Sequence, residues 1–324
     1  MIIKDDEKIV KQPTISVIVT TYNQEKYIAE CLDSILSQQC NVPFELIVSD
    51  DASADGTGKI CADFQKRHPE CMIFLQQEKN RGMLDNYADV LELCRGKYVA
   101  QCAGDDYWCD PLKLQKQFDC LEKREGFGFV RTAGWRLQSG HLSPSADGEF
   151  DLEGDVRSLT SYGPIGLAAS VFFERQLLQY VDIRSFKALG ITMEDYPMHA
   201  IFAHHTKFAY IADRCVVYRA TPNSISKNAS FDKRISFALG KVEAQRYLRN
   251  LYPDELGDVF SDDFLADTAA YLRLRQTIYH FRYAEAKRQK SLIVTEQYKR
   301  KKFNRFFRGP ISFAMLAVFI RFRN

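Results

Sequence analysis

The chain has 324 residues, of which 46% are apolar and 27% charged, enough for one large domain with an appended segment. Its net charge of +2 is unevenly spread, because residues 282–324 contain 12 Lys/Arg and 2 Asp/Glu and so leave −8 on residues 1–281. An acidic body argues against nucleic-acid binding, and a basic end indicates contact with an anionic surface. The nine cysteines are scattered without a C-x-x-C pair, which argues against a disulfide framework or a zinc site and favours a reducing compartment.

The N-terminal part of the chain alternates short apolar runs with amphipathic stretches. Strand and helix alternating over short connections predict an α/β fold with a doubly wound, mostly parallel sheet and helices on both faces. Loops that follow parallel strands gather at one edge of such a sheet, where ligands bind. Strands are expected at residues 15–19, 44–48, 72–75 and 97–102, with helices at 28–36, about 57–67 and 84–91.

Polar residues follow these strands in four loops, at residues 20–23, 50–57, 80–82 and 105–106. We expect the four loops to converge on one cleft. The sequence contains neither a G-x-G-x-x-G fingerprint nor a P-loop motif. Acidic side chains and an aromatic residue stand in their place, which favours a phosphate held through a metal ion, with the base and ribose held by side chains.

Two adjacent carboxylates, Asp105 and Asp106, lie at the mouth of the fourth strand. Carboxylates in one turn repel each other unless a cation or a donor lies between them. A hard divalent ion, Mg²⁺ or Mn²⁺, would relieve that repulsion and keep coordination sites open for phosphate. The alternative is a solvated turn, since Asp is a common turn residue. Asp110 and Pro111 then predict the start of a helix.

Asp195 is a candidate general base. Pro197 is expected to open a short helix, so Asp195 lies near a helix N-terminus, where the dipole favours its ionised form. A plain helix cap is the alternative. The other expected elements of this half are a strand at 127–130, a mobile loop over 136–164, a strand edge lining the cleft at 166–173, the helix through His204, strands at 208–211 and 216–219, and a C-terminal helical extension over 231–288.

Residues 299–324 interleave Lys and Arg with Phe and then become almost entirely apolar from Ile311 to Ile320. This run is shorter than the ~18 apolar residues that a membrane span requires. It suits an interfacial helix with basic flanks, and a terminal helix docked on the body is the open alternative. Because no secretory signal precedes the first strand, we expect a cytoplasmic protein, at the inner face of the membrane if this tail binds there.

Four stretches taken together resemble one family. They are Thr20-Thr21-Tyr22-Asn23, the run VSDDASADGT from Val48 to Thr57, Gly96-Lys97-Tyr98, and Asp105-Asp106. In this order they are similar to the family 2 glycosyltransferases of GT-A fold, over about residues 13–225. The expected organisation is a nucleotide-sugar-dependent catalytic domain at 13–225, a helical extension at 226–298 and a basic amphipathic tail at 299–324.

The resemblance also implies roles for single residues. Asp51 would accept a hydrogen bond from the pyrimidine N–H, Asp106 would be the direct ligand of Mn²⁺ or Mg²⁺, and Asp195 would be the catalytic base. Thr221 departs from the pattern, because many relatives have a His at this point after the Tyr-Arg pair. Without that His, the metal would rely on Asp106, the diphosphate and water. The residues expected to bind the nucleotide are Thr20, Tyr22, Asn23, Asp51, Arg81 and Asp105.

The implied activity is that of an inverting glycosyltransferase. It would move a sugar from a nucleotide diphosphate sugar, expected to be a UDP-sugar, to a glycan or lipid-linked acceptor in bacterial-type surface polysaccharide synthesis. Asp195 would take the proton from the acceptor hydroxyl, which attacks the anomeric carbon opposite the leaving group. Two other functions stay open: a catalytically silent nucleotide-sugar-binding or scaffold protein, and a nucleotidyltransferase that releases pyrophosphate.

Overall fold

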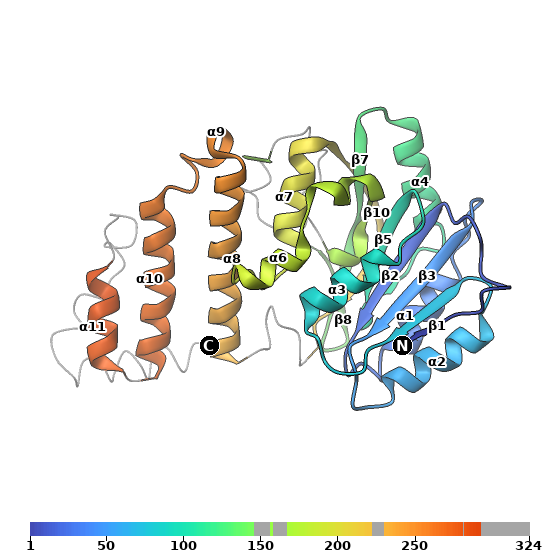
Figure 1. Ribbon diagram of the computed structural model, residues 1–324, viewed down its shortest axis with the longest axis horizontal. Coiled ribbons are helices and arrows are strands. Elements are labelled where there is room, and N and C mark those ends of the chain that lie inside the picture. The colour runs from blue at the N-terminus through green and yellow to red at the C-terminus, as the bar shows by residue number, and fades with distance from the viewer. Residues whose placement is uncertain (146–155, 158–166, 222–229, 281, 293–324) are drawn as a thin grey trace. The chain divides into compact units, whose positions relative to one another are not determined.

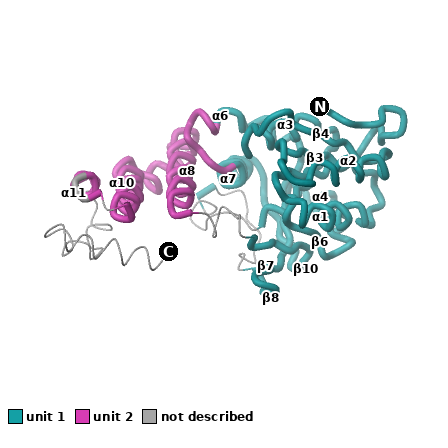
Figure 2. Tube along the Cα trace, turned by 90° about the horizontal axis from the view of Figure 1, so that it is seen from below, with its two compact units in different colours: residues 1–185, 194–221 teal, residues 186–193, 222–324 magenta. Residues whose placement is uncertain are grey.

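The computed structural model describes residues 1–145, 156–157, 167–221, 230–280 and 282–292 (Figure 1). The chain divides into two compact units. Unit 1 comprises residues 1–185 and 194–221, and unit 2 comprises residues 186–193 and 222–324 (Figure 2). Unit 1 therefore draws on two separate stretches of sequence.

Within the described part of unit 1, ten strands form one mixed sheet in the order β1-β4-β3-β2-β5-β9-β7-β10-β6, with β8 paired to β7. Strands β4, β3, β2 and β5 run parallel, and β10 runs parallel to β7. The strands are β1 (Ile2–Ile3), β2 (Ile15–Thr21), β3 (Phe44–Asp50), β4 (Met72–Gln76), β5 (Tyr98–Ala103), β6 (Tyr107–Trp108), β7 (Phe127–Gln138), β8 (His141–Pro144), β9 (Val171–Glu174) and β10 (Lys207–Arg219).

Helices cover both faces of this sheet, as the alternation of side chains along β2 requires. Val17 and Val19 belong to one core cluster with the apolar stripes of α1, α2 and α4. Ile18 is equally buried but faces the other way, and α3 packs against β2 and β3. The helices of unit 1 are α1 (Ile28–Leu36), α2 (Thr57–Arg67), α3 (Met83–Glu92), α4 (Lys113–Lys123) and α7 (Asp195–His205), with 3₁₀ turns at Ala168–Ser170 and Arg175–Tyr180. Helix α6 (Ile183–Ala188) begins in unit 1 and ends in unit 2.

Unit 2 is helical where it is described, which confirms the expected C-terminal helical extension. Ser230 and Ser261 cap its two long helices by accepting backbone N–H bonds. A Cβ at Gly240 would lie 2.1 Å from the Thr192 hydroxyl oxygen, so this close approach requires glycine. The helices are α8 (Phe231–Leu251), α9 (Pro253–Leu256), α10 (Asp262–Tyr279) and α11 (Tyr283–Ser291).

The α/β fold class is confirmed, and several boundaries are corrected. Helix α4 begins at Lys113 rather than directly after Asp110, whose carboxylate accepts the Leu112 N–H at 2.8 Å in the preceding turn. The loop expected over 136–164 is wrong up to residue 144, because β7 continues to Gln138 and β8 pairs back on it. The rest of that loop, apart from residues 145 and 156–157, and the whole tail at 299–324 lie outside the described residues.

Three further corrections concern the second half of unit 1. Strand β9 lies between β5 and β7, antiparallel to both, and is not at an edge. Helix α7 begins at Asp195, two residues before Pro197. The two strands expected at 208–211 and 216–219 form one strand, β10, whose irregular register between Ile211 and Val216 accommodates the polar residues between them.

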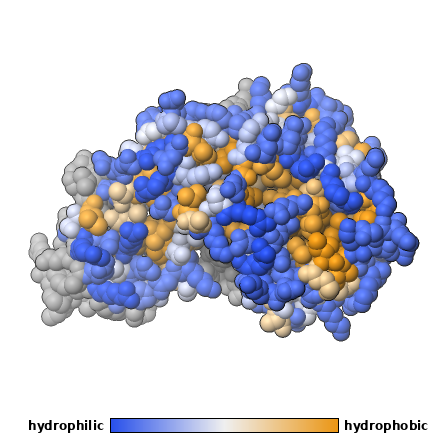
Figure 3. Space-filling model, in the orientation of Figure 1, coloured by the Kyte–Doolittle hydropathy of each residue, from blue (hydrophilic) through white to orange (hydrophobic). Residues whose placement is uncertain are grey.

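The described chain has no helix long and apolar enough to cross a membrane. Hydrophilic residues cover much of the face shown in Figure 3, with apolar residues showing between them. Two of the large exposed apolar side chains, Tyr22 at 47% and Met83 at 38%, lie in or next to the polar loops at the carboxyl edge of the sheet.

Candidate functional site

The acidic turn follows β5 at the centre of the sheet. Gly104 donates its N–H to the carbonyl of Thr20 at 3.1 Å, which joins this turn to the end of β2. A Cβ at Gly104 would lie 2.5 Å from Gln24 Oε1 and 2.8 Å from Thr21 Oγ1, so a larger residue does not fit. The backbone thus carries Asp105 and Asp106 to the edge where Thr20 ends its strand.

Both carboxylates of the turn resist ionisation. Asp106 is 3% exposed, and its Oδ1 accepts the backbone N–H of Arg219 at 2.8 Å. Burial, and then the charge of Asp105, raise the pKa of Asp106 well above its usual range. Burial also raises the pKa of Asp105, whose Oδ2 accepts the Thr221 hydroxyl at 3.4 Å.

These residues fit a hard divalent cation. Every donor in the turn is an oxygen, and a cation would offset the repulsion between two partly desolvated carboxylates. Among the described residues there is no group of three or more His, Cys, Asp or Glu that could hold a metal ion. The protein would therefore supply few ligands, and a bound phosphate and water would supply the rest.

Arg219, which the sequence-based site did not include, ties the acidic turn to β10. Its Nη1 donates to the carbonyl of Asp105 at 2.9 Å, and its Nη2 pairs with Glu30 on α1. The guanidinium lies over the ring of Tyr107, 4.5 Å from its centroid. Its side chain is 9% exposed. The sequence feature that could have pointed to Arg219 is its position at the end of an apolar strand, two residues before Thr221.

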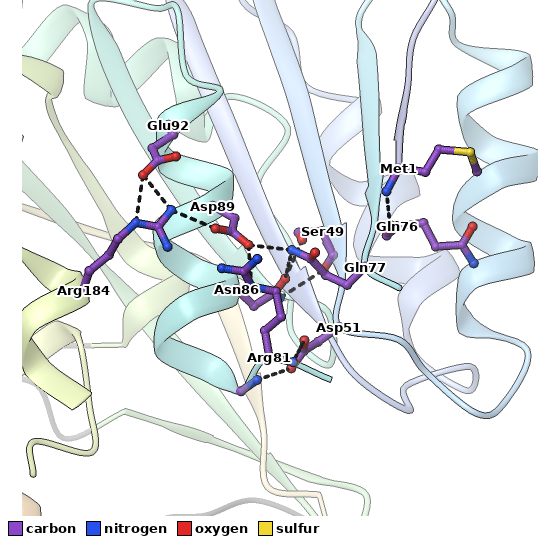
Figure 4. A network of polar contacts seen from close by, with 11 residues as sticks. Met1, Ser49, Asp51, Gln76, Gln77, Arg81, Asn86, Asp89, Glu92 and Arg184 are labelled. Carbon is purple, nitrogen blue, oxygen red and sulfur yellow. Dashed lines mark hydrogen bonds and ion pairs between the residues drawn. The ribbon is translucent and has the colours of Figure 1, made fainter. Parts of the chain in front are cut away.

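Asp51 is held at the end of β3 by the loop before α3. Its Oδ1 accepts the Arg81 N–H at 2.7 Å and its Oδ2 accepts the Gly82 N–H at 3.0 Å (Figure 4). Gly82 has φ +87°, which an L side chain rarely adopts, so glycine is needed to aim this N–H. Asp51 and Arg81 are thus brought together through the backbone, while the Arg81 guanidinium pairs with Asp89 on α3.

The loop after β2 joins the loop after β3. Asn23 donates its N–H to Ser53 Oγ at 2.8 Å, and its Oδ1 accepts the Ala54 N–H at 2.8 Å. Its φ of +53° is tolerated by Asn better than by most residues. Tyr22 precedes it with an exposed ring, which suits stacking on a planar base.

Asp195 begins α7, and Glu194 is the residue before the helix. Asp195 Oδ1 accepts the Tyr196 N–H at 2.6 Å. Burial, and then the charge of Asp195, raise the pKa of Glu194 to about 8. Glu194 also lines a cavity of about 40 Å³ with Thr20 and Ala103, and this places the start of α7 beside the ends of β2 and β5. The sequence-based site did not include Glu194.

The mixed α/β sheet of this chain belongs to the fold class of the GT-A glycosyltransferases. The family described as glycosyl transferase family 2 matches residues 16–141. The putative teichuronic acid biosynthesis glycosyltransferase TuaG of Bacillus subtilis is 33% identical over 247 residues, covering 74% of this chain and 92% of that protein. The chain therefore belongs to glycosyl transferase family 2.

Other matching proteins are longer than this chain or share its fold at low sequence identity. An uncharacterised protein of Mycobacterium tuberculosis is 32% identical over 223 residues, which cover 68% of this chain and 62% of that protein. The mannosyltransferase PcManGT from Pyrobaculum calidifontis, solved with GDP-Man and Mn²⁺, has a TM-score of 0.54 at 18% identity, covering 95% of this chain and 88% of that one. TarS of S. aureus in complex with UDP also has a TM-score of 0.54, at 17% identity, covering 90% of this chain and 93% of that one.

Proposed function

We propose that this protein is an inverting glycosyltransferase that takes a sugar from a nucleoside diphosphate sugar and transfers it to a glycan or lipid-linked acceptor in the synthesis of a surface polysaccharide. The observation that carries the proposal is the pair of desolvated carboxylates, Asp105 and Asp106, beside Thr20 and the loop of Asp51. The name of TuaG supports glycosyl transfer in polysaccharide synthesis. The UDP and GDP-Man bound by the two solved relatives support the donor class.

Each residue of the site has a proposed task. Tyr22 stacks on the base, Asp51 accepts its N–H, and Thr20, Asn23 and Arg81 complete the nucleotide-binding side. Asp106, with Asp105, would hold Mn²⁺ or Mg²⁺, which when bound offsets the charge that develops on the departing diphosphate.

Asp195 is the proposed base that accepts the proton of the acceptor hydroxyl. Its carboxylate already accepts one backbone N–H at the start of α7, and the helix dipole there favours the ionised form. Burial and the charge of Asp195 raise the pKa of Glu194, which favours a neutral Glu194 beside an ionised Asp195. The hydroxyl then attacks the anomeric carbon from the face opposite the diphosphate, so the configuration inverts.

A panel of nucleotide sugars tests the donor class. The full chain with Mn²⁺ should be stabilised against heat by one class of donor, by roughly 2.7 kcal/mol at about 100 times its Kd. Transfer to an acceptor, or slow donor hydrolysis releasing the nucleoside diphosphate, would mark a transferase. Binding without either reaction would indicate a silent binding protein, and release of pyrophosphate from a nucleoside triphosphate and a sugar phosphate would indicate a nucleotidyltransferase.

Two variants test the site. Asp106→Asn retains an acceptor for the Arg219 N–H but removes the charge, and it should lose turnover together with the Mn²⁺ dependence of donor binding. Asp195→Asn should keep the donor Kd and slow transfer by ~10² to 10⁴-fold, the usual contribution of a positioned base. The control is Asp119→Asn, on the exposed side of α4. Normal turnover in either site variant would contradict the role proposed for the substituted residue.

We also propose that residues 299–324, with their basic and apolar sequence, bring the protein to an anionic membrane surface on the cytoplasmic side. Each Lys or Arg near such a surface contributes ~1 kcal/mol. Replacing the four basic residues 299–302 by Gln should therefore weaken sedimentation with anionic vesicles and leave donor hydrolysis unchanged. Equal sedimentation of both proteins at low and high salt would contradict the proposal.

A further inference from the structure

We propose that Asp89, on α3, is a positioning residue for nucleotide recognition: it braces the loop that holds Asp51, with Arg184 as its second cationic partner. This inference rests on the proposed function, because it assigns a role in donor binding. Asp89 lies outside the four loops that the sequence pointed to, and no donor is expected to touch it.

The Asp89 carboxylate is the hub of a polar network on one side of α3 (Figure 4). Its Oδ2 accepts from Arg81 Nε at 3.0 Å and from Gln77 Nε2 at 2.8 Å. Its Oδ1 accepts from Arg184 Nη2 at 2.8 Å, and Arg184 also contacts Glu92 at 2.6 Å. Two carboxylates and two guanidinium groups therefore balance one another.

Because Asp89 is largely buried, its ion pairs contribute more to the stability of the loop than exposed ion pairs would. Isolated ion pairs on a protein surface contribute little, because water screens them and long side chains lose entropy. Asp89 has a side chain only 12% exposed, and it accepts from three donors at once. Removing the charge of such a group weakens the hold on both arginines, although Arg184 keeps its contact with Glu92.

The network fixes both ends of one loop. Gln77 follows β4, Arg81 precedes α3, and Asp89 holds the side chains of both. The residues between them are exposed, and the side chain of Asn80 donates to the carbonyl of Asp51 at 3.3 Å. The N–H groups of Arg81 and Gly82 then have fixed directions, and these two groups hold the Asp51 carboxylate. Displacement of this loop would rotate the acceptor proposed to recognise the base.

Limited proteolysis of the full chain tests the brace without any ligand. Trypsin cuts after Lys79 and Arg81 only when this loop opens. Asp89→Asn should raise the cleavage rate there about tenfold, whereas cleavage after Lys66, at the end of α2, should stay at the wild-type rate. Arg184→Gln should act in the same direction but less strongly, since Asp89 keeps its other donors. Asp119→Asn on α4 is the matched control, because it removes a carboxylate from an exposed helical pair.

Binding of UDP, CDP and GDP, each with Mn²⁺, tests the role in recognition. For the nucleotide that the wild type prefers, Asp89→Asn should raise Kd about tenfold and should lower its preference over the other two. If Asp89 only stabilised the loop, Asp89→Asn would speed cleavage but leave the preference among the three nucleotides unchanged. That result would overturn the inference. Wild-type cleavage and wild-type Kd values in Asp89→Asn would also overturn it. If the wild type binds none of the three, the proposed function itself fails, while the trypsin result still decides whether Asp89 braces the loop.

Discussion

We expect the buried imidazole of His199 to make the stability of unit 1 depend on pH. His199 lies on α7 with 1% exposure, and within the described residues neither ring nitrogen has a hydrogen-bond partner. Its ring packs edge-on against Phe129, with the centroids 5.0 Å apart. Burial, and then the charge of Arg131, lower the pKa of His199 to about 3. The folded protein therefore holds a neutral imidazole in an environment that cannot accommodate its charge.

The direction of the pH effect follows from the pKa of His199 in the folded and in the unfolded state. The usual pKa of histidine is 6.5, so the unfolded chain takes up a proton well before the folded one as the pH falls. Above pH 6.5 the ring is neutral in both states and does not change the free energy of unfolding. Between about pH 6.5 and about pH 3 the free energy of unfolding falls by ~1.36 kcal/mol per pH unit. Near pH 5, His199 alone should have cost unit 1 roughly 2 kcal/mol.

Urea unfolding followed by tryptophan fluorescence measures this loss in unit 1 alone, because both tryptophans, Trp108 and Trp135, belong to that unit. His199→Leu removes the titrating ring, so its stability should fall by roughly 2 kcal/mol less than that of the wild type between about pH 7.5 and about pH 5. His204→Gln removes an exposed histidine from the same helix and serves as the control. Parallel losses in the wild type and His199→Leu would refute the reasoning.

Two other predictions concern buried positions. Burial lowers the pKa of Lys113 to about 7 from 10.5, so the wild type should gain roughly 2 kcal/mol of stability between about pH 7 and about pH 9, a gain that Lys113→Met should lack in the same fluorescence assay. Gly240→Ala should destabilise unit 2 by about 1–3 kcal/mol despite the better helix propensity of Ala, because its Cβ meets Thr192. Slower amide exchange along α8 in this variant would contradict that expectation.

The first half of unit 1 could be predicted because its signals are local. The β-branched run that forms β2 and the apolar stripe of α1 are each contained within a few residues. The apolar residues of β2 are buried, as are Ile28, Cys31, Leu32 and Ile35 of α1, and Leu36 is partly buried. The polar loops could be placed because parallel strands end at one edge. The roles given to their residues remain predictions.

What the sequence could not reveal depends on partners distant along the chain. Arg184 pairs with Asp89 across 95 positions, and no local spacing marks either residue. The insertion of β9 between β5 and β7 is equally non-local. The continuity of β10 was missed because Asp213 and Arg214 interrupt its apolar pattern, and only the irregular register with β7 allows the strand to carry them.

The hydrogen bond from Arg219 to Asp106 also constrains how the protein is made. It joins residues 113 positions apart, and β6, which directly follows Asp106, pairs with β10. At ~5–20 residues per second, a ribosome needs roughly 6 to 23 s to pass from one partner to the other. Strands β2 to β5 can pair during this interval, while the edge of β7 that will receive β10 stays open. Until Arg219 has been synthesised, this open edge can pair with another chain, and the acidic turn lacks its hydrogen bond to β10.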